Sequence, residues 1–82
     1  MNKVLVKLYV PMIEEQYDVW IPINKKTYKV MKLLIKAVNE FSDGYYNPQN
    51  PMLYDKLTGT LYDMNSIIKK NNIKNGSEIV LI

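Results

Sequence analysis

Apolar and polar residues alternate twice near the start of the chain, which is the pattern of half-buried β-strands. The first alternation ends at Pro11, and the second follows the polar turn Glu14–Gln16. The alternating apolar positions are Val4, Val6, Leu8 and Val10, and then Tyr17, Val19, Ile21 and Ile23. This arrangement predicts two strands joined as a hairpin.

The hydrophobic period then changes from two residues to that of a helix, from Lys25 to about Phe41. One face of this helix is apolar, and lysines recur on the opposite face. The apolar positions are Val30, Leu34, Ala37, Val38 and Phe41, and the lysines are Lys25, Lys29, Lys32 and Lys36. Ser42–Gly44 is a stop signal, so the pattern predicts one amphipathic helix.

The second half of the chain contains shorter elements. A proline-bounded loop over 45–51 precedes two short strands, 52–56 and 60–62, around the Thr58–Gly59 turn. A short helical turn over 66–70 and the Asn75–Gly76 turn then lead to a closing strand over 78–82. The order is ββαββ, a short helical turn, then β, which predicts a single α+β domain over residues 1–82.

The predicted core places one helix on a mixed sheet of four to five strands. Val30, Leu34, Val38 and Phe41 of the helix are expected to pack against the strand residues Val4, Val6, Leu8, Val19, Ile21, Ile79 and Leu81. An 82-residue chain encloses one core of this kind.

The composition narrows the possible chemistry. The sequence has no cysteine, histidine or arginine, so it contains no thiolate or imidazole for catalysis or metal binding. Glu14–Glu15 is either an acid–base or metal pair or a solvated hairpin turn, and we favour the turn. We therefore predict no catalytic, cofactor-binding or metal-binding residue and no enzyme. With neither a signal peptide nor a membrane span in its hydropathy, we expect a cytoplasmic protein or one at the periphery of a membrane complex.

The net charge of +3 comes from eleven lysines, and it raises the question of an anionic partner. The stripe of Lys25, Lys29, Lys32 and Lys36 could bind nucleic acid or an anionic membrane surface. A face opposite the core must be polar in any case, however, so we favour a solvated helix face.

Trp20 is the more informative residue. If Tyr17, Val19, Ile21 and Ile23 face the helix, alternation places Trp20 on the other sheet face. The apolar residues expected on that uncovered face, and hence to bind a partner, are Leu5, Tyr9, Trp20, Val80 and Ile82. The alternatives are that a bulge shifts the alternation and buries Trp20, or that the Tyr45–Tyr46 loop covers it.

Two stretches carry a resemblance to a known family. Residues 61–81, with an isoleucine, a turn and a strand after a short helix, resemble the closing third of ubiquitin-like β-grasp folds. The stretch Tyr17–Pro22 (YDVWIP) resembles the second strand of the EsaB/YukD family. These are small ubiquitin-like proteins encoded with Gram-positive type VII secretion systems, and the resemblance covers essentially the whole chain.

The resemblance implies a cytosolic accessory or regulatory component that docks on a protein of a secretion machine. Conjugated ubiquitin-like modifiers need a flexible tail ending in Gly-Gly, whereas this sequence ends in a strand at Ile82, so we expect no conjugation. We expect a protein partner or a second copy, no metal and no nucleic acid. The alternative is a basic nucleic-acid or anionic-surface binder acting through the lysine stripe. Its binding would fall steeply with salt, whereas binding by an apolar patch would not.

Overall fold

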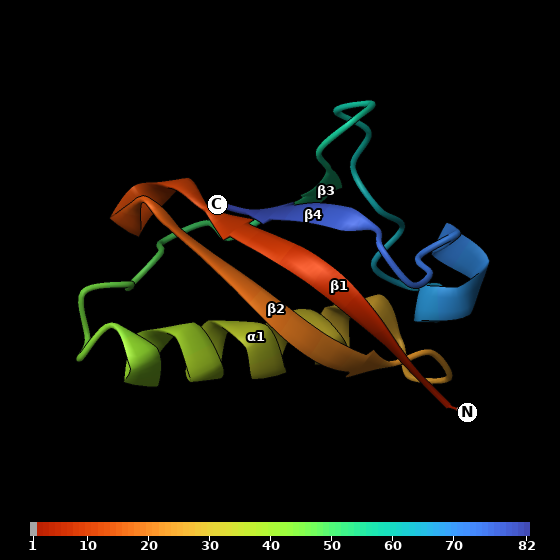
Figure 1. Cartoon of the computed structure of the whole chain (residues 1–82), viewed down its shortest axis with the longest axis horizontal. Helices are drawn as coiled ribbons and strands as arrows, with labels where there is room; N and C mark the ends of the chain where they lie inside the picture. Colours follow the sequence, from red (N-terminus) through yellow and green to blue (C-terminus); the bar gives the residue numbers. More distant parts are fainter. Residues whose placement is uncertain (1) are drawn as a thin grey trace.

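A computed structural model describes residues 2–82, which form a four-stranded sheet with one long helix (Figure 1). The strands are β1 (Lys3–Val10), β2 (Glu15–Pro22), β3 (Leu53–Asp55) and β4 (Glu78–Leu81). The helix α1 spans Thr27–Phe41, and the short 3₁₀ turns η1 and η2 span Pro11–Ile13 and Ile68–Asn71. The strand order in the sheet is β2-β1-β4-β3, so β2 and β3 are its edges.

The first two strands form the predicted hairpin. They pair antiparallel, with Val4 opposite Ile21 and Val6 opposite Val19. The connecting turn begins at Pro11, whose ring suits the first position of a 3₁₀ turn, and Glu14 closes it with a φ of 53°. The register places Val6 and Leu8 on the helix side of the sheet, where both are buried.

The helix covers one face of the sheet and runs alongside β2 (Figure 1). Its buried positions are Thr27, Val30, Leu34 and Val38, one stripe at helical spacing. The prediction that Phe41 completes this stripe is wrong, because its side chain is 62% exposed. Phe41 is the last residue of α1 and packs on the outer hairpin strand, with its ring centroid 5.4 Å from that of Tyr17.

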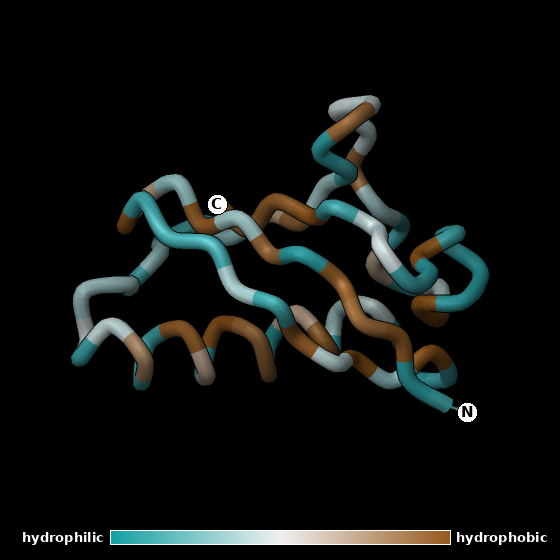
Figure 2. The backbone as a smooth tube through the Cα atoms, viewed as in Figure 1, coloured by the Kyte–Doolittle hydropathy of each residue, from teal (hydrophilic) through white to brown (hydrophobic). Residues whose placement is uncertain are grey.

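The chain end returns to the middle of the sheet. β4 pairs parallel with β1, with Leu8 opposite Ile79, and antiparallel with β3, with Leu53 opposite Leu81. The predicted strand over 60–62 is reduced to an isolated bridge between Leu61 and Tyr54. Figure 2 shows how apolar positions recur along the central strands and the helix, where the core forms.

Residues outside the regular elements complete the core. Ile68, the first residue of η2, and Ile73, just after this turn, are buried, and Tyr46 of the loop after α1 is fully buried. The phenol of Tyr46 has no hydrogen-bond partner within residues 2–82, and burial raises its pKa to about 12. The loop that follows the helix therefore belongs partly to the core.

Two aspartates stabilise the turns of the second half. Burial by itself would raise the pKa of Asp55, but hydrogen bonds donated by Thr58 and Tyr62 hold it below its ordinary value. Bonds from the Asn65 backbone and the Ser66 hydroxyl hold the pKa of Asp63 low in the same way.

Candidate partner-binding site

The sheet face opposite the helix carries the side chains that alternation assigned to it. The strand register puts Leu5 opposite Trp20, Lys7 opposite Asp18, and Tyr9 opposite Val80. This register confirms that Trp20 lies on the open face, alongside Leu5. We call this surface, with Leu5, Tyr9, Trp20, Val80 and Ile82 as its apolar members, the open face.

The apolar pair Leu5–Trp20 forms the exposed end of the open face. Trp20 is 55% exposed and Leu5 is 37% exposed. They border a shallow hollow of about 310 Å³, which the Asn75–Gly76 turn closes on one side. A tryptophan left this accessible beside a hollow is typical of an anchor residue at an interface.

The turn after η2 holds this end of the face in place. The Leu5 N–H donates to Asn75 Oδ1 and the Gly76 N–H donates to the Leu5 carbonyl, each over 2.8 Å. Gly76 has a φ of 87°, a conformation that favours glycine. These two bonds hold the Asn75–Gly76 turn against β1 beyond the end of β4. The turn therefore forms a fixed wall of the hollow beside Trp20.

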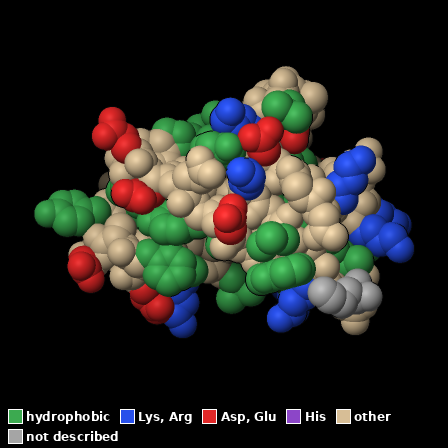
Figure 3. Space-filling model, in the orientation of Figure 1, with side chains coloured by type: hydrophobic (Ala, Val, Ile, Leu, Met, Phe, Trp, Pro, Cys, Tyr) green, Lys and Arg blue, Asp and Glu red, His purple; other side chains and the backbone are tan. Residues whose placement is uncertain are grey.

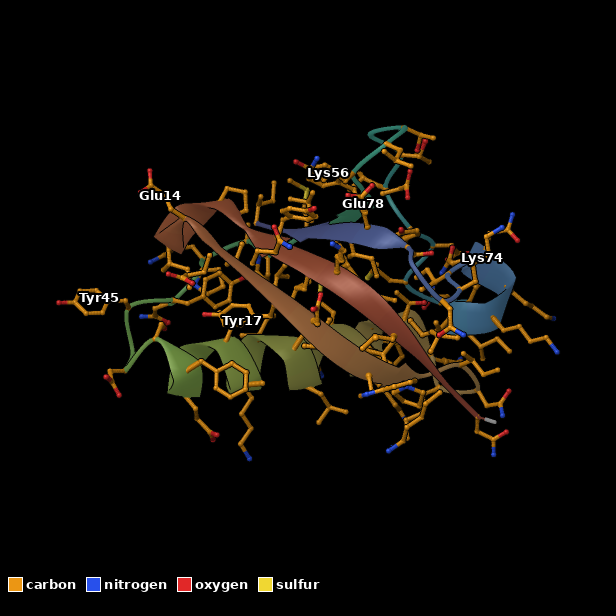
Figure 4. All side chains as sticks on the ribbon, in the orientation of Figure 1. Glu14, Tyr17, Tyr45, Lys56, Lys74 and Glu78 are labelled. Carbon is orange, nitrogen blue, oxygen red and sulfur yellow. The ribbon has the colours of Figure 1, made fainter. Side chains whose placement is uncertain are left out.

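The other end of the open face is covered by its own polar side chains. The Tyr9 hydroxyl donates to Glu78 Oε1 over 2.9 Å, and the Lys56 amine lies 4.8 Å from the centre of the Tyr9 ring. Figure 4 shows Lys56 and Glu78 next to each other above the sheet. The hydrogen bond to Glu78 is the main cause that raises the pKa of Tyr9, so the phenol stays protonated.

Val80 lies in this covered region and is only 5% exposed, with Tyr9 and Tyr54 as its register partners. Ile82 is half-buried and exchanges two backbone hydrogen bonds of 3.0 Å with Met52. A partner at this end would therefore touch Tyr9 and Ile82, with Val80 beneath them.

A polar band divides the two ends. In the strand register Lys7 lies opposite Asp18 of β2 and opposite Glu78 of β4, so three charged residues cross the face here. The five predicted residues therefore share one face, but they do not form one continuous apolar patch. Lys56 and Asn75 were not predicted at this face, because both reach it from turns whose contacts have no periodic signal in the sequence.

The lysines of the alternative site are placed as the helical pattern predicts. Lys25, Lys29, Lys32 and Lys36 are all exposed on or just before α1. The one aromatic contact in this group is between the Lys32 amine and the Tyr28 ring, 5.6 Å from its centre. The part of the chain from Asn2 to Ile82 holds no group of three or more acidic, histidine or cysteine side chains able to bind a metal ion. None of its helices has both the length and the apolar character needed to cross a membrane.

Comparison with known proteins identifies the fold. No protein-family model matches the sequence, and neither does any curated protein. Among solved structures, the EccD5 ubiquitin-like domain from Mycobacterium xenopi matches with a TM-score of 0.80 and 17% identity, covering 100% of this chain and 94% of that one. The ubiquitin-like domain of the Mycobacterium tuberculosis type VII secretion system protein EccD1 matches with a TM-score of 0.78 and 10% identity, covering 100% and 99%.

A third match is a chain of the MycP5-free ESX-5 inner membrane complex, with a TM-score of 0.82 and 15% identity. It covers 100% of this protein but 21% of that larger chain. At such low identities the likeness establishes the fold. The protein has a ubiquitin-like β-grasp fold, with one helix packed on a mixed four-stranded sheet, and it is structurally similar to domains of type VII secretion proteins.

Proposed function

We propose that residues 1–82 form a single, non-enzymatic ubiquitin-like interaction module of a type VII secretion system. In this proposal the chain is a cytosolic accessory or regulatory component of the EsaB/YukD kind, and it docks on a protein component of the machine. The similarity to ubiquitin-like domains of EccD proteins supports the secretion context.

The observation that carries the binding role is the exposed Trp20 beside Leu5 on the sheet face opposite α1. Burying a tryptophan and a leucine together in a partner's pocket supplies both hydrophobic area and an anchor. In this proposal Leu5 and Trp20 make the central contact, Tyr9 and Ile82 extend it past the polar band, and Val80 supports them from below.

Affinity capture from an extract of the native cell tests this proposal. Wild type is compared with Trp20→Ala and Leu5→Ala, and with Lys29→Glu/Lys32→Glu as the matched surface control. Truncating an aromatic anchor costs about 2 kcal/mol or more, which weakens binding roughly thirtyfold. We expect the Trp20→Ala variant to lose a secretion-machine protein that wild type retains, while the lysine variant keeps it.

The salt dependence of capture separates the two candidate surfaces. Binding through Leu5 and Trp20 should survive about 0.5 M salt, because apolar contacts are weakly screened. Circular dichroism confirms that each variant is folded. Capture of nucleic acid, or capture that the lysine variant abolishes and Trp20→Ala does not, would refute the open face and favour the basic alternative.

A further inference from the structure

A second unpartnered surface lies along the edge of the sheet, between β2 and α1. Two adjoining hollows that share Phe41, of about 520 and 300 Å³, border this edge. Nine large hydrophobic side chains are exposed within residues 2–82, and five of them line these hollows: Met12, Trp20, Leu33, Phe41 and Tyr45. We call this surface the edge groove.

The backbone of β2 is also free along the edge groove. The Ile23 N–H donates to the Asn2 carbonyl, so the odd-numbered residues of this hairpin strand direct their backbone groups toward β1. The even-numbered residues Gln16, Asp18 and Trp20 therefore direct their N–H and C=O groups outward. Within residues 2–82, β2 pairs with β1 alone, which leaves an eight-residue edge strand open to a further strand.

Charge is distributed unevenly along the edge groove. Because α1 runs opposite to β2, the start of β2 lies near the end of α1, where the carboxylates Glu14, Glu15, Glu40 and Asp43 occur. The other end carries Lys25, Lys26 and Lys29, beside the start of the helix. Figure 3 shows acidic side chains concentrated toward the left end and lysines concentrated toward the right, with side chains of both signs between them, and Figure 4 places Glu14 and Tyr45 at the left end.

These charges oppose the helix dipole. The first turn of α1 has no acidic residue and its last turn has no basic one, whereas Lys29 lies in the first turn and Glu40 in the last. The dipole favours the reverse arrangement, so these charges destabilise the isolated helix. Their placement therefore points to an interaction outside the single chain.

From these features we infer that the edge groove binds a second copy of this chain, as a two-fold dimer through β2. A two-fold axis makes the two β2 strands antiparallel, which satisfies the outward backbone groups and joins two sheets into one. The same axis places the acidic end of each copy on the basic end of the other. It also aligns the two α1 helices antiparallel on one side of the joined sheet, where Leu33 and Phe41 of both copies bury one another.

This surface meets the open face at Trp20, which borders both, and its other residues differ. The dimer covers the edge and the helix seam, while Leu5 on β1 stays accessible in both copies. Variants in the charged ends leave Leu5 and Trp20 unchanged, so loss of the dimer and loss of the secretion partner can be distinguished.

Sedimentation and light scattering over about 1 μM to 1 mM protein test the inference. As the concentration increases, we expect the apparent mass of wild type to rise from 9.6 kDa toward twice that value, and we expect added salt to weaken the association. The acidic variant Lys26→Glu/Lys29→Glu and the basic variant Glu15→Lys/Glu40→Lys should each dimerise about tenfold more weakly or worse, because like charges then meet at both ends. An equimolar mixture of the two variants should restore the dimer.

Thermal unfolding of the variants shows whether a charge change weakens the dimer or damages the fold of the monomer. Both charge changes improve the match to the helix dipole, so each variant monomer should be at least as stable as the wild-type monomer. Exchange of the Gln16, Asp18 and Trp20 amides should also slow as wild type is concentrated. A wild type that stays monomeric at about 1 mM, or a mixture of variants that does not associate, would overturn the inference.

Discussion

Replacing Tyr46 by phenylalanine should stabilise the protein, although it removes a polar atom from a well-packed site. The side chain is 0% exposed and its hydroxyl has no partner within residues 2–82. Desolvating a hydroxyl without a compensating hydrogen bond costs about 1–3 kcal/mol. The small void left by one oxygen atom offsets a few tenths of a kcal/mol, at about 24 cal/mol per Å³. We therefore expect Tyr46→Phe to raise the free energy of unfolding by about 1–2 kcal/mol.

Urea unfolding measures this change directly, with the midpoint rising and the slope unchanged. For a domain of this size each kcal/mol corresponds to about 4–8 °C in the melting temperature. Tyr62→Phe is the matched control, because the Tyr62 hydroxyl donates to Asp55 Oδ1 over 3.3 Å. That variant should lose about 1 kcal/mol. If Tyr46→Phe is destabilised as much as Tyr62→Phe, then the Tyr46 hydroxyl has a partner and the reasoning fails.

Two further predictions concern stability. Leu34→Ala should lower the free energy of unfolding by about 2–5 kcal/mol, because Leu34 is only 6% exposed. The control Leu57→Ala, at a residue that is 76% exposed, should change it by less than about 0.5 kcal/mol. Equal changes in urea unfolding would contradict the assignment of Leu34 to the core. The pKa values of Asp55 and Asp63 lie below their ordinary 3.8, so their contribution is present above about pH 4 and is lost as the pH falls through the folded values. In the double variant Asp55→Asn/Asp63→Asn, the urea midpoint should fall less steeply below about pH 4 than it does in wild type. A pH dependence equal to that of wild type would contradict the stabilising role of the two carboxylates.

Periodic patterns in the sequence predicted most of the fold. Alternation identified the hairpin and placed Trp20 on the same sheet face as Leu5, because one buried face sets the parity of every residue in a strand. The helical stripe through Val30, Leu34 and Val38 was equally clear. The same rule failed at Phe41, since a residue at the end of a helix can match the stripe and still extend beyond the sheet it should cover.

Contacts made by irregular segments could not be predicted. Tyr45 and Tyr46 are adjacent in a proline-bounded loop, yet one is 83% exposed and the other is buried. Only the path of the loop decides which of them enters the core. The covering of the Tyr9 end of the open face had the same origin, because Lys56 reaches Tyr9 from a turn after a three-residue strand.

The parallel pairing of β1 with β4 also has a consequence for how the protein is made. Lys7 lies opposite Glu78, so the first strand of this domain completes its pairing only with the last strand of the same domain. A nascent chain can form the β1–β2 hairpin and α1 early, but the inner edge of β1 remains open until β4 has left the ribosome. The core therefore closes after translation of this segment, by a long-range step. Such a topology favours folding in milliseconds or slower rather than microseconds, and the waiting chain exposes an apolar strand edge that a chaperone would recognise.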